Sequence, residues 1–324
     1  MAELYTYAAS RIHAREADLL TQGDIEQLCA CADFSSALKA LRERGYGFDR
    51  EYTDFEGLRR DETDKMWSLI HELIPDKTPF ETLFRPIDFH NLKAAVKLVL
   101  TSEQGGEFFK SGGTVEPELI YNAVKSGSYG DLPKFLRQAA IDATDVLSKT
   151  GDGQECDICI DRACLETMVN DGKESDTDLI RRYTELYAAV SNIKIAVRGA
   201  KMQKPLSFFE RALAECESLD IDALKINAAR GVGDVCKYLM NTDYRAGAEI
   251  LENTNSMSEF EKWADNEVMA LMKEQKSNPF TIQPIFAYII AKQNELKAVQ
   301  IILAGKKNEL DNSFIRERIR DLYV

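Results

Sequence analysis

The chain has 324 residues, of which 44% are hydrophobic and 29% are charged, and this balance is typical of a soluble globular protein with a sizeable core. Its net charge of −13 argues against a nucleic-acid partner, because binding to a phosphate backbone requires a basic surface. No apolar run reaches the ~20 residues that span a bilayer, and residues 1–16 lack the apolar region of a signal peptide, so we expect a cytoplasmic protein.

The N-terminal part of the sequence predicts a series of helices. Residues 5–20 place their apolar side chains near one helical face, and Gly23 is the expected stop. Asp24 and Asp33 are residues of the type that caps helix N-termini, so each is expected to open a further helix. Gly45 is expected to end the second of these two helices.

Prolines and glycines divide the rest of the chain. A helix over residues 63–74 is expected to stop at Pro75. Pro79 fits the first turn of the next helical run, and Pro86 should kink or split that run. Alternation of period two is scarce, so the predicted fold is all-α. Further breaks are expected at residues 102–114, 150–154, 170–176 and around Lys204–Pro205.

A helical pattern recurs at intervals of about one hundred residues. The segment DFHNLKAAVKLVL (residues 88–100) resembles VSNIKIAVRGA (residues 190–200), and QNELKAVQIILAGKKN (residues 293–308) is a weaker third copy. Each of the first two copies has an apolar stripe, a mid-helix asparagine and two basic residues four positions apart. The candidate site residues are Asn91, Lys93, Lys97, Asn192, Lys194 and Arg198.

The third copy aligns with either Glu295 or Ala298 at the asparagine position, which leaves Ile301 or Ala304 at the second basic position. A second correspondence joins residues 37–47 to residues 235–245 and matches Leu41 and Tyr46 with Leu239 and Tyr244. Two correspondences in the same order predict internal repetition around a pseudo-three-fold. The expected units are residues 1–105, 106–205 and 206–324.

Cysteines and histidines suggest neither a disulfide framework nor a metal site. The seven cysteines are an odd number and are scattered, as expected for reduced thiols. The segment CDICIDRAC contains Cys156, Cys159 and Cys164, but structural zinc requires four ligands and the three histidines have no matching spacing. We interpret these thiols as core residues. The histidines are His13, His71 and His90.

No cofactor is expected either. LAGKKN lacks the upstream glycine and the Ser/Thr of a phosphate-binding loop, and GVGD lacks the preceding strand of a dinucleotide turn. The basic residues of FIRERIRDLYV (residues 314–324) alternate with acidic ones, so this segment is interpreted as a solvated helix face.

The chain resembles the C subunit of the V-type and A-type rotary ATPases, a relative of the d subunit of the eukaryotic V-ATPase. The resemblance lies in residues 5–47, residues 85–100 and residues 286–324, and in the mid-chain helix of residues 156–169 with Asp161. It covers essentially the whole chain. It implies an all-α funnel of three similar helical units.

The resemblance also implies a function. Members of this family are non-catalytic rotor parts of the central stalk, which link the D and F subunits of the shaft to the proteolipid ring for coupled ion transport and ATP synthesis or hydrolysis. The protein would then lie on the inner face of the cell membrane. Under one alignment the family would have Asn and Arg where this chain has Ala298 and Gln300. The six candidate residues would either face the shaft or tie neighbouring helices together.

One alternative comes from the residues alone. A helical protein with a cleft between its units could act as a thiol hydrolase through Cys164 or Cys236 and a histidine close in space. A catalytic thiol of that kind should have a depressed pKa, whereas a core cysteine should not.

Overall fold

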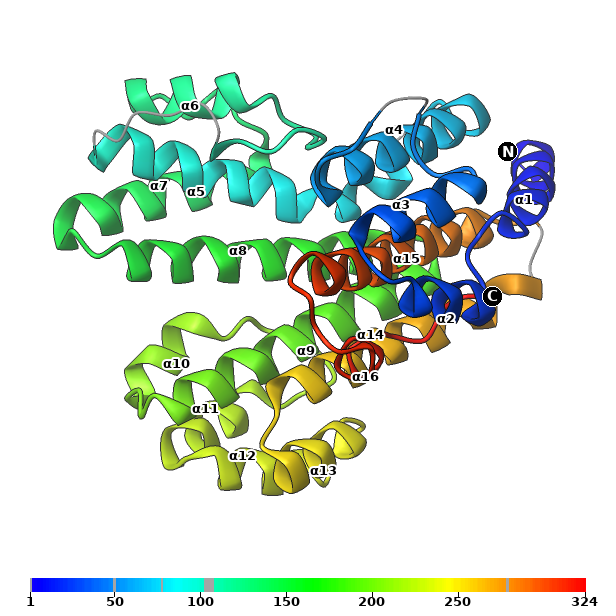
Figure 1. Cartoon of the computed structure of the whole chain (residues 1–324). Coiled ribbons are helices and arrows are strands. Elements are labelled where there is room, and N and C mark those ends of the chain that lie inside the picture. The colour runs from blue at the N-terminus through cyan, green and yellow to red at the C-terminus, as the bar shows by residue number, and fades with distance from the viewer. Residues whose placement is uncertain (1, 49–50, 77, 102–107, 278–279) are drawn as a thin grey trace. The chain divides into compact units, whose positions relative to one another are not determined.

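The computed structural model describes residues 2–48, 51–76, 78–101, 108–277 and 280–324. Throughout these residues all regular secondary structure is helical (Figure 1), which confirms the predicted all-α fold. The helices form two compact units. Unit 1 consists of Met1–Lys77 with Thr254–Val324, and unit 2 consists of Thr78–Asn253. No helix of the described part of the chain combines the length and low charge needed to cross a membrane.

Unit 1 is organised around α15, whose side chains are buried along most of its length. Helices from the beginning of the chain and helices from its end both pack on α15. The two terminal segments therefore share one core. The elements of unit 1 are α1 (Ala2–Glu16), α2 (Gln22–Ala30), α3 (Phe34–Glu43), α4 (Phe55–Leu73), α14 (Met257–Lys273), the 3-10 helix η3 (Glu274–Ser277), α15 (Gln283–Lys307) and α16 (Asn312–Glu317).

Unit 2 is organised around two long helices, α8 and α9, that pack on each other, with α5 and α7 on α8 and with α11 and α12 on α9. Short helices fill the spaces beside them. The elements of unit 2 are η1 (Thr78–Leu83), α5 (Arg85–Thr101), α6 (Pro117–Ser126), α7 (Lys134–Thr150), α8 (Gly153–Glu174), α9 (Asp178–Lys201), α10 (Leu206–Ala212), α11 (Ile221–Arg230), α12 (Val232–Leu239) and α13 (Arg245–Thr254).

Two of the predicted helix boundaries near the N-terminus are wrong. The first helix ends at Glu16, and Gly23 lies inside α2 rather than stopping α1. Thr21 is the N-cap of α2, and Asp24 occupies the third position of its capping box, where its carboxylate accepts the backbone N–H of Thr21. Asp33 caps α3 as predicted.

The breaks predicted at residues 150–154 and around Lys204–Pro205 are confirmed, and residues 102–107 of the break predicted at 102–114 lie outside the described residues. Pro86 lies in the first turn of α5, where its missing N–H does no harm, and η1 precedes it as a separate helix. The break expected within residues 170–176 lies at the end of that range, because α8 continues to Glu174 and α9 begins at Asp178. A Cβ on Gly172 would lie 2.0 Å from Oγ1 of Thr184 on α9, so this glycine allows two helices to approach closely.

The C-terminal segment is an exposed helix only in its first part, up to Glu317. Helix α16 ends at Glu317, and the residues after it are non-helical and packed. Ile319 and Tyr323 are buried, and the nearly buried Arg320 pairs through Nε with Oδ2 of Asp265 at 2.9 Å. Of the basic residues of this segment, Arg320 therefore holds it against α14, whereas Arg316 and Arg318 are exposed and Arg316 pairs with Glu26 of α2.

The three predicted repeat units are not identical with the two compact units. The predicted boundary at residue 105 lies outside the described residues, and the boundary at residue 205 falls between α9 and α10, inside unit 2. Unit 1 joins the first and the last segments of the chain. A division into three repeats stays a prediction.

Candidate functional site

The two predicted asparagines make the same contact on different helices. Asn91 on α5 donates through Nδ2 to the Lys110 carbonyl at 2.9 Å and accepts the Lys110 N–H at 2.8 Å. Asn192 on α9 donates to the Ala214 carbonyl at 2.8 Å and accepts the Ala214 N–H at 2.9 Å. Both side chains are fully buried. Asn91 therefore fixes the segment after α5, and Asn192 fixes the segment after α10.

The basic residues of α5 pair with α8 inside unit 2. Lys93 Nζ lies 2.6 Å from Oδ1 of Asp161, and Lys97 Nζ lies 2.8 Å from Oδ2 of Asp157. These four residues join helices that the repeat prediction assigns to different units. On α9, Lys194 is half-buried and Arg198 is exposed.

The ends of α9 and α15 share a geometry that the sequence pattern did not reveal. A Cβ on Gly199 would lie 2.6 Å from the Phe209 ring on α10, and a Cβ on Gly305 would lie 2.6 Å from Ile315 on α16. In each unit the glycine therefore lets the following short helix approach the long one.

The same two turns also share a backbone conformation. Gln203 and Glu309 have left-handed φ values of 53° and 54°. The next N–H of each turn bonds to the carbonyl of Gly199 or Gly305, as in a Schellman cap.

This correspondence decides between the two possible alignments of the third copy. The offset that pairs Gly199 with Gly305 places Ala298 opposite Asn192, so the Ala298 alignment fits the structure and the Glu295 alignment does not. Ala298 has no side-chain amide, and Asn294, one turn earlier on α15, supplies one instead. Its Nδ2 donates to the Asp321 carbonyl at 2.8 Å. Sequence reasoning missed Asn294, although an asparagine one turn from the expected position was the available signal.

Carboxylates on the same long helices form a second set of contacts that sequence reasoning missed. The buried Asp88 accepts the N–H groups of Thr114 at 2.7 Å and Val115 at 3.1 Å. Burial raises the pKa of Asp88, although these hydrogen bonds and Arg85 oppose the shift.

Unit 2 contains a second carboxylate of this kind. Glu185 on α9 accepts the N–H groups of Glu217 and Ser218, both at 2.8 Å. Each carboxylate thus fixes the backbone just before α6 or α11 begins.

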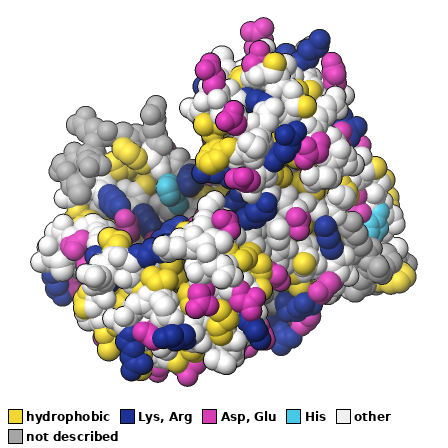
Figure 2. Space-filling view, turned by 60° about the horizontal axis from the view of Figure 1, so that its bottom comes forward, with side chains coloured by type: hydrophobic (Ala, Val, Ile, Leu, Met, Phe, Trp, Pro, Cys, Tyr) yellow, Lys and Arg dark blue, Asp and Glu magenta, His cyan; other side chains and the backbone are white. Residues whose placement is uncertain are grey.

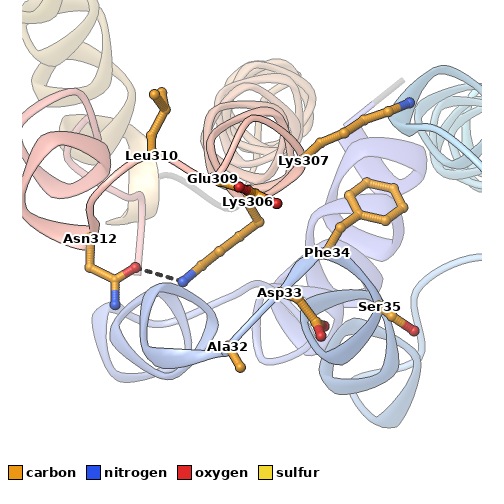
Figure 3. Close-up of a pocket in the computed structure, with 9 residues that line it drawn as sticks. All are labelled: Ala32, Asp33, Phe34, Ser35, Lys306, Lys307, Glu309, Leu310 and Asn312. Atoms are coloured by element: carbon orange, nitrogen blue, oxygen red, sulfur yellow. Dashed lines mark hydrogen bonds between the residues drawn. The ribbon is translucent and has the colours of Figure 1, made fainter.

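The pocket of unit 1 in Figure 3, of about 570 Å³, is lined by the α2–α3 turn and the end of α15. Its most buried charge is Lys306, whose Nζ donates to the Cys29 carbonyl at 2.7 Å, to the Cys31 carbonyl and to Oδ1 of Asn312 at 2.6 Å. The ammonium group thus caps the C-terminal end of α2. Its three hydrogen bonds give this lysine a structural role.

The thiols do not have the environment of a nucleophile. Burial raises the pKa of Cys164 to about 12 and also raises the pKa of Cys236. His90 contacts the carbonyl of Phe108, and His13 contacts Glu16. Within the described residues no group of histidine, cysteine and acidic side chains has the arrangement of a metal site. The geometry therefore gives no support to the thiol-hydrolase interpretation.

Acidic and basic side chains are interspersed on the face shown in Figure 2. Many charged side chains of the described residues pair locally; in unit 2, for example, Arg211 Nε lies 2.7 Å from Oε2 of Glu155. Exposed pairs of this kind contribute up to ~1 kcal/mol each, so they influence association more than folding.

Comparison with known proteins gives a consistent result. The sequence matches the model of the ATP synthase (C/AC39) subunit family over residues 8–318. It is 22% identical to the C subunit of the V-type sodium ATPase of Enterococcus hirae, over 96% of this chain and 97% of that protein. It is also 22% identical to the C subunit of the A-type ATP synthase of Methanocaldococcus jannaschii, over 98% and 86% of the two chains. The C subunit of the A-type ATP synthase of Haloquadratum walsbyi is 21% identical over 96% of both chains.

Proposed function

Because the chain belongs to the ATP synthase (C/AC39) subunit family, we propose that it is the non-catalytic central-stalk subunit of a V-type or A-type ATPase. The observation that carries this proposal is the extent of the match, which includes residues 8–318 and nearly the full length of the Enterococcus hirae relative. Because the two chains align over nearly their full lengths, we expect this chain to have the same role in its complex. The protein would then lie on the cytoplasmic face of the membrane through its complex.

The proposed task is mechanical. The D and F subunits of the shaft would bind one side of the chain and the proteolipid ring the other, so that rotation couples ion transport to ATP synthesis or hydrolysis. Three similar helical units around a pseudo-three-fold would give the funnel such a part needs. Torque transmission requires a stiff body, and buried contacts such as Asn192–Ala214 and Asp88–Val115 supply stiffness because they fix backbone segments to long helices.

We assign the candidate residues to internal ties between the predicted repeats. Asn91 and Asn192 are buried and bonded to backbone, which leaves their amides no surface to offer a shaft. Lys93 and Lys97 pair with carboxylates of α8. Lys194 and Arg198 occupy the corresponding positions of α9 and belong to the same proposal.

The test is assembly with purified partners. The chain is mixed with the D–F shaft pair, with detergent-solubilised proteolipid ring, and with both, and complexes are separated by size-exclusion chromatography. The expected result is binding to each partner alone and a ternary complex with both. Binding to neither partner would overturn the proposal, and binding to one alone would refute the linking role. A shaft pair from an F-type ATPase serves as the control for specificity.

A further inference from the structure

A carboxylate on α15, the long helix of unit 1, fixes the backbone of another segment, as Asp88 on α5 and Glu185 on α9 do. We call a carboxylate with this role a clamp. Glu295 on α15 accepts the backbone N–H of Leu20 and the hydroxyl of Tyr46, and its Oε1 lies 2.7 Å from Nζ of Lys292. Leu20 immediately precedes the cap of α2, as Val115 and Ser218 precede α6 and α11. The difference is that Leu20 is separated from Glu295 by 275 residues.

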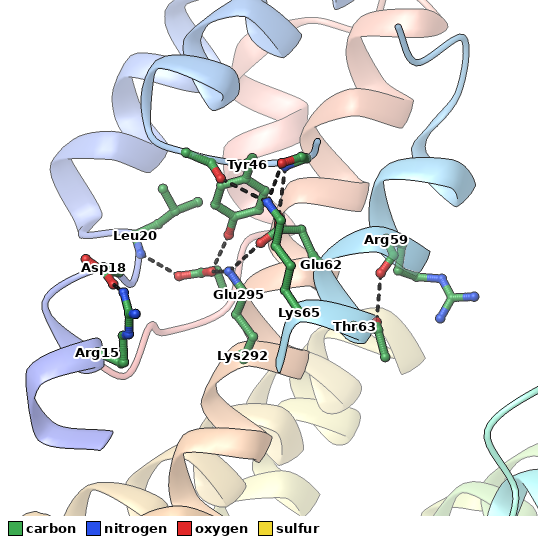
Figure 4. A network of polar contacts seen from close by, with 12 residues as sticks. Arg15, Asp18, Leu20, Tyr46, Arg59, Glu62, Thr63, Lys65, Lys292 and Glu295 are labelled. Carbon is green, nitrogen blue, oxygen red and sulfur yellow. Dashed lines mark hydrogen bonds and ion pairs between the residues drawn. The ribbon is translucent and has the colours of Figure 1, made fainter. Parts of the chain in front are cut away.

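Figure 4 shows that this clamp is part of a buried ion cluster. Lys292 Nζ also lies 3.1 Å from Oε2 of Glu62, whose other oxygen accepts the Gly47 N–H and Nζ of Lys65, both at 2.8 Å. Two carboxylates thus face two ammonium groups. Burial favours the neutral amine, but Glu295 and Glu62 outweigh it and raise the pKa of Lys292, so the ion pairs persist at neutral pH.

Apolar contacts accompany the cluster. The α2–α3 region and α15 share one buried cluster, to which Leu28, Leu38 and Leu41 contribute from one side and Val299, Ile302 and Leu303 from the other. Lys306 of α15 caps α2 through Cys29. The N-terminal segment is therefore fastened to α15 by charge, by capping and by apolar contact.

We infer that the N-terminal segment, residues 2–47, is a strap that closes unit 1 by packing the start of the first predicted repeat on the long helix of the third. Helices α2 and α3 take the part that α11 and α12 take beside α9. The matched residues Tyr46 and Tyr244 support this, since Tyr46 bonds to Glu295 and Tyr244 bonds to Ser218, which bonds to Glu185. The strap opens as one cooperative segment, separately from unit 2.

The test is amide hydrogen exchange on the isolated chain, followed by mass spectrometry of peptides. In Glu295→Ala, exchange should rise roughly 100-fold in α2, in α3 and in the part of α15 that they cover, because the variant loses one of the two carboxylates that balance Lys292 and leaves the N–H of Leu20 and the hydroxyl of Tyr46 unpaired in a buried position. Peptides of unit 2 should keep their wild-type rates. The matched control is Glu185→Ala, which should accelerate exchange in the segment before α11 and leave residues 2–47 unchanged.

A milder pair of variants keeps the inference testable if Glu295→Ala does not fold. Tyr46→Phe removes one hydrogen bond to the clamp, and Tyr244→Phe removes its counterpart in unit 2. Exchange should rise about tenfold in the strap for Tyr46→Phe and in α11 and α12 for Tyr244→Phe. Equal acceleration in both units, or acceleration of α2 without α3, would overturn the inference.

Discussion

A side-chain amide or carboxylate buried in a helical protein destabilises the fold unless its donors and acceptors are hydrogen-bonded. Asn192 meets this condition through paired bonds to Ala214, and Asp88 through bonds to Thr114 and Val115. These polar residues specify which segment lies beside each long helix, since a displaced segment would leave them unpaired.

The first prediction concerns Asn192. Replacement by alanine leaves the N–H and carbonyl of Ala214 unpaired in a buried position and should destabilise the protein by about 2–4 kcal/mol. Urea denaturation monitored by circular dichroism measures the change. Asn241→Ala is the control, because Asn241 is exposed and its amide bonds to the Lys237 carbonyl at the end of α12, so it should change stability by less than ~0.5 kcal/mol. Equal losses of stability in the two variants would show that the bonds between Asn192 and Ala214 do not stabilise the fold.

The second prediction concerns Cys164. With its pKa raised to about 12 by burial, its thiolate population at pH 8 is on the order of 1000-fold below that of an unperturbed thiol. Alkylation by iodoacetamide should be correspondingly slow in the folded protein and should accelerate as pH rises towards that pKa. Peptide mapping after timed alkylation measures the rate. Rapid labelling of Cys164 at pH 7 would revive the thiol-hydrolase interpretation.

At the scale of elements, the long helices and the short helices that follow them form a repeated pair. Gly199 and Gly305 bring α10 and α16 close, and the turns at Gln203 and Glu309 reverse the chain in the same way. Because a Cβ has no room at either glycine, the pairing depends on glycine for space rather than for flexibility.

The third prediction tests this packing. Gly199→Ala improves intrinsic helix propensity by up to ~1 kcal/mol but drives a Cβ into the Phe209 ring, so the net effect should be destabilisation by about 1–2 kcal/mol. Gly305→Ala should destabilise the protein to a similar extent, because its Cβ would meet Ile315. Gly233→Ala in α12 is the matched control, since its Cβ would meet nothing within 4 Å and should stabilise slightly. Thermal unfolding of the three variants provides the comparison, and a stabilised Gly199→Ala would refute the close approach.

At the scale of the whole molecule, an assembly experiment can separate an internal role of the basic residues from an interface role. The Lys97–Asp157 pair permits a charge swap. Lys97→Glu alone should lower stability by up to ~1 kcal/mol, and the double variant Lys97→Glu, Asp157→Lys should restore it.

The outcome in the assembled ATPase then decides between the two roles, and this is the fourth prediction. An internal tie predicts that the swapped double variant assembles and transports as many ions per ATP as the wild type. A shaft contact predicts that the swap restores stability but not coupling, with a defect that deepens at low salt where charge repulsion is least screened. Ion transport and ATP hydrolysis are measured together in reconstituted vesicles.

Features that depend on neighbouring residues could be predicted from the amino-acid order alone. Helical periodicity specified the all-α fold, Asp33 marked a helix start, Pro86 marked a split in a helical run, and the matching of Asn91 with Asn192 predicted the contact that both make. These signals are local, since capping, proline geometry and amphipathic spacing act within a turn or two of the chain.

Packing in the folded chain selects the distant segments that those helices meet. Packing at Gly305 set the alignment of the third copy, and it showed that Asn294 replaces the missing amide. The contact of Glu295 with Leu20 closes unit 1 across 275 residues. No periodicity or cap encodes such a contact, because the energy that selects it comes from burying charges and apolar groups that are neighbours only after the chain has folded.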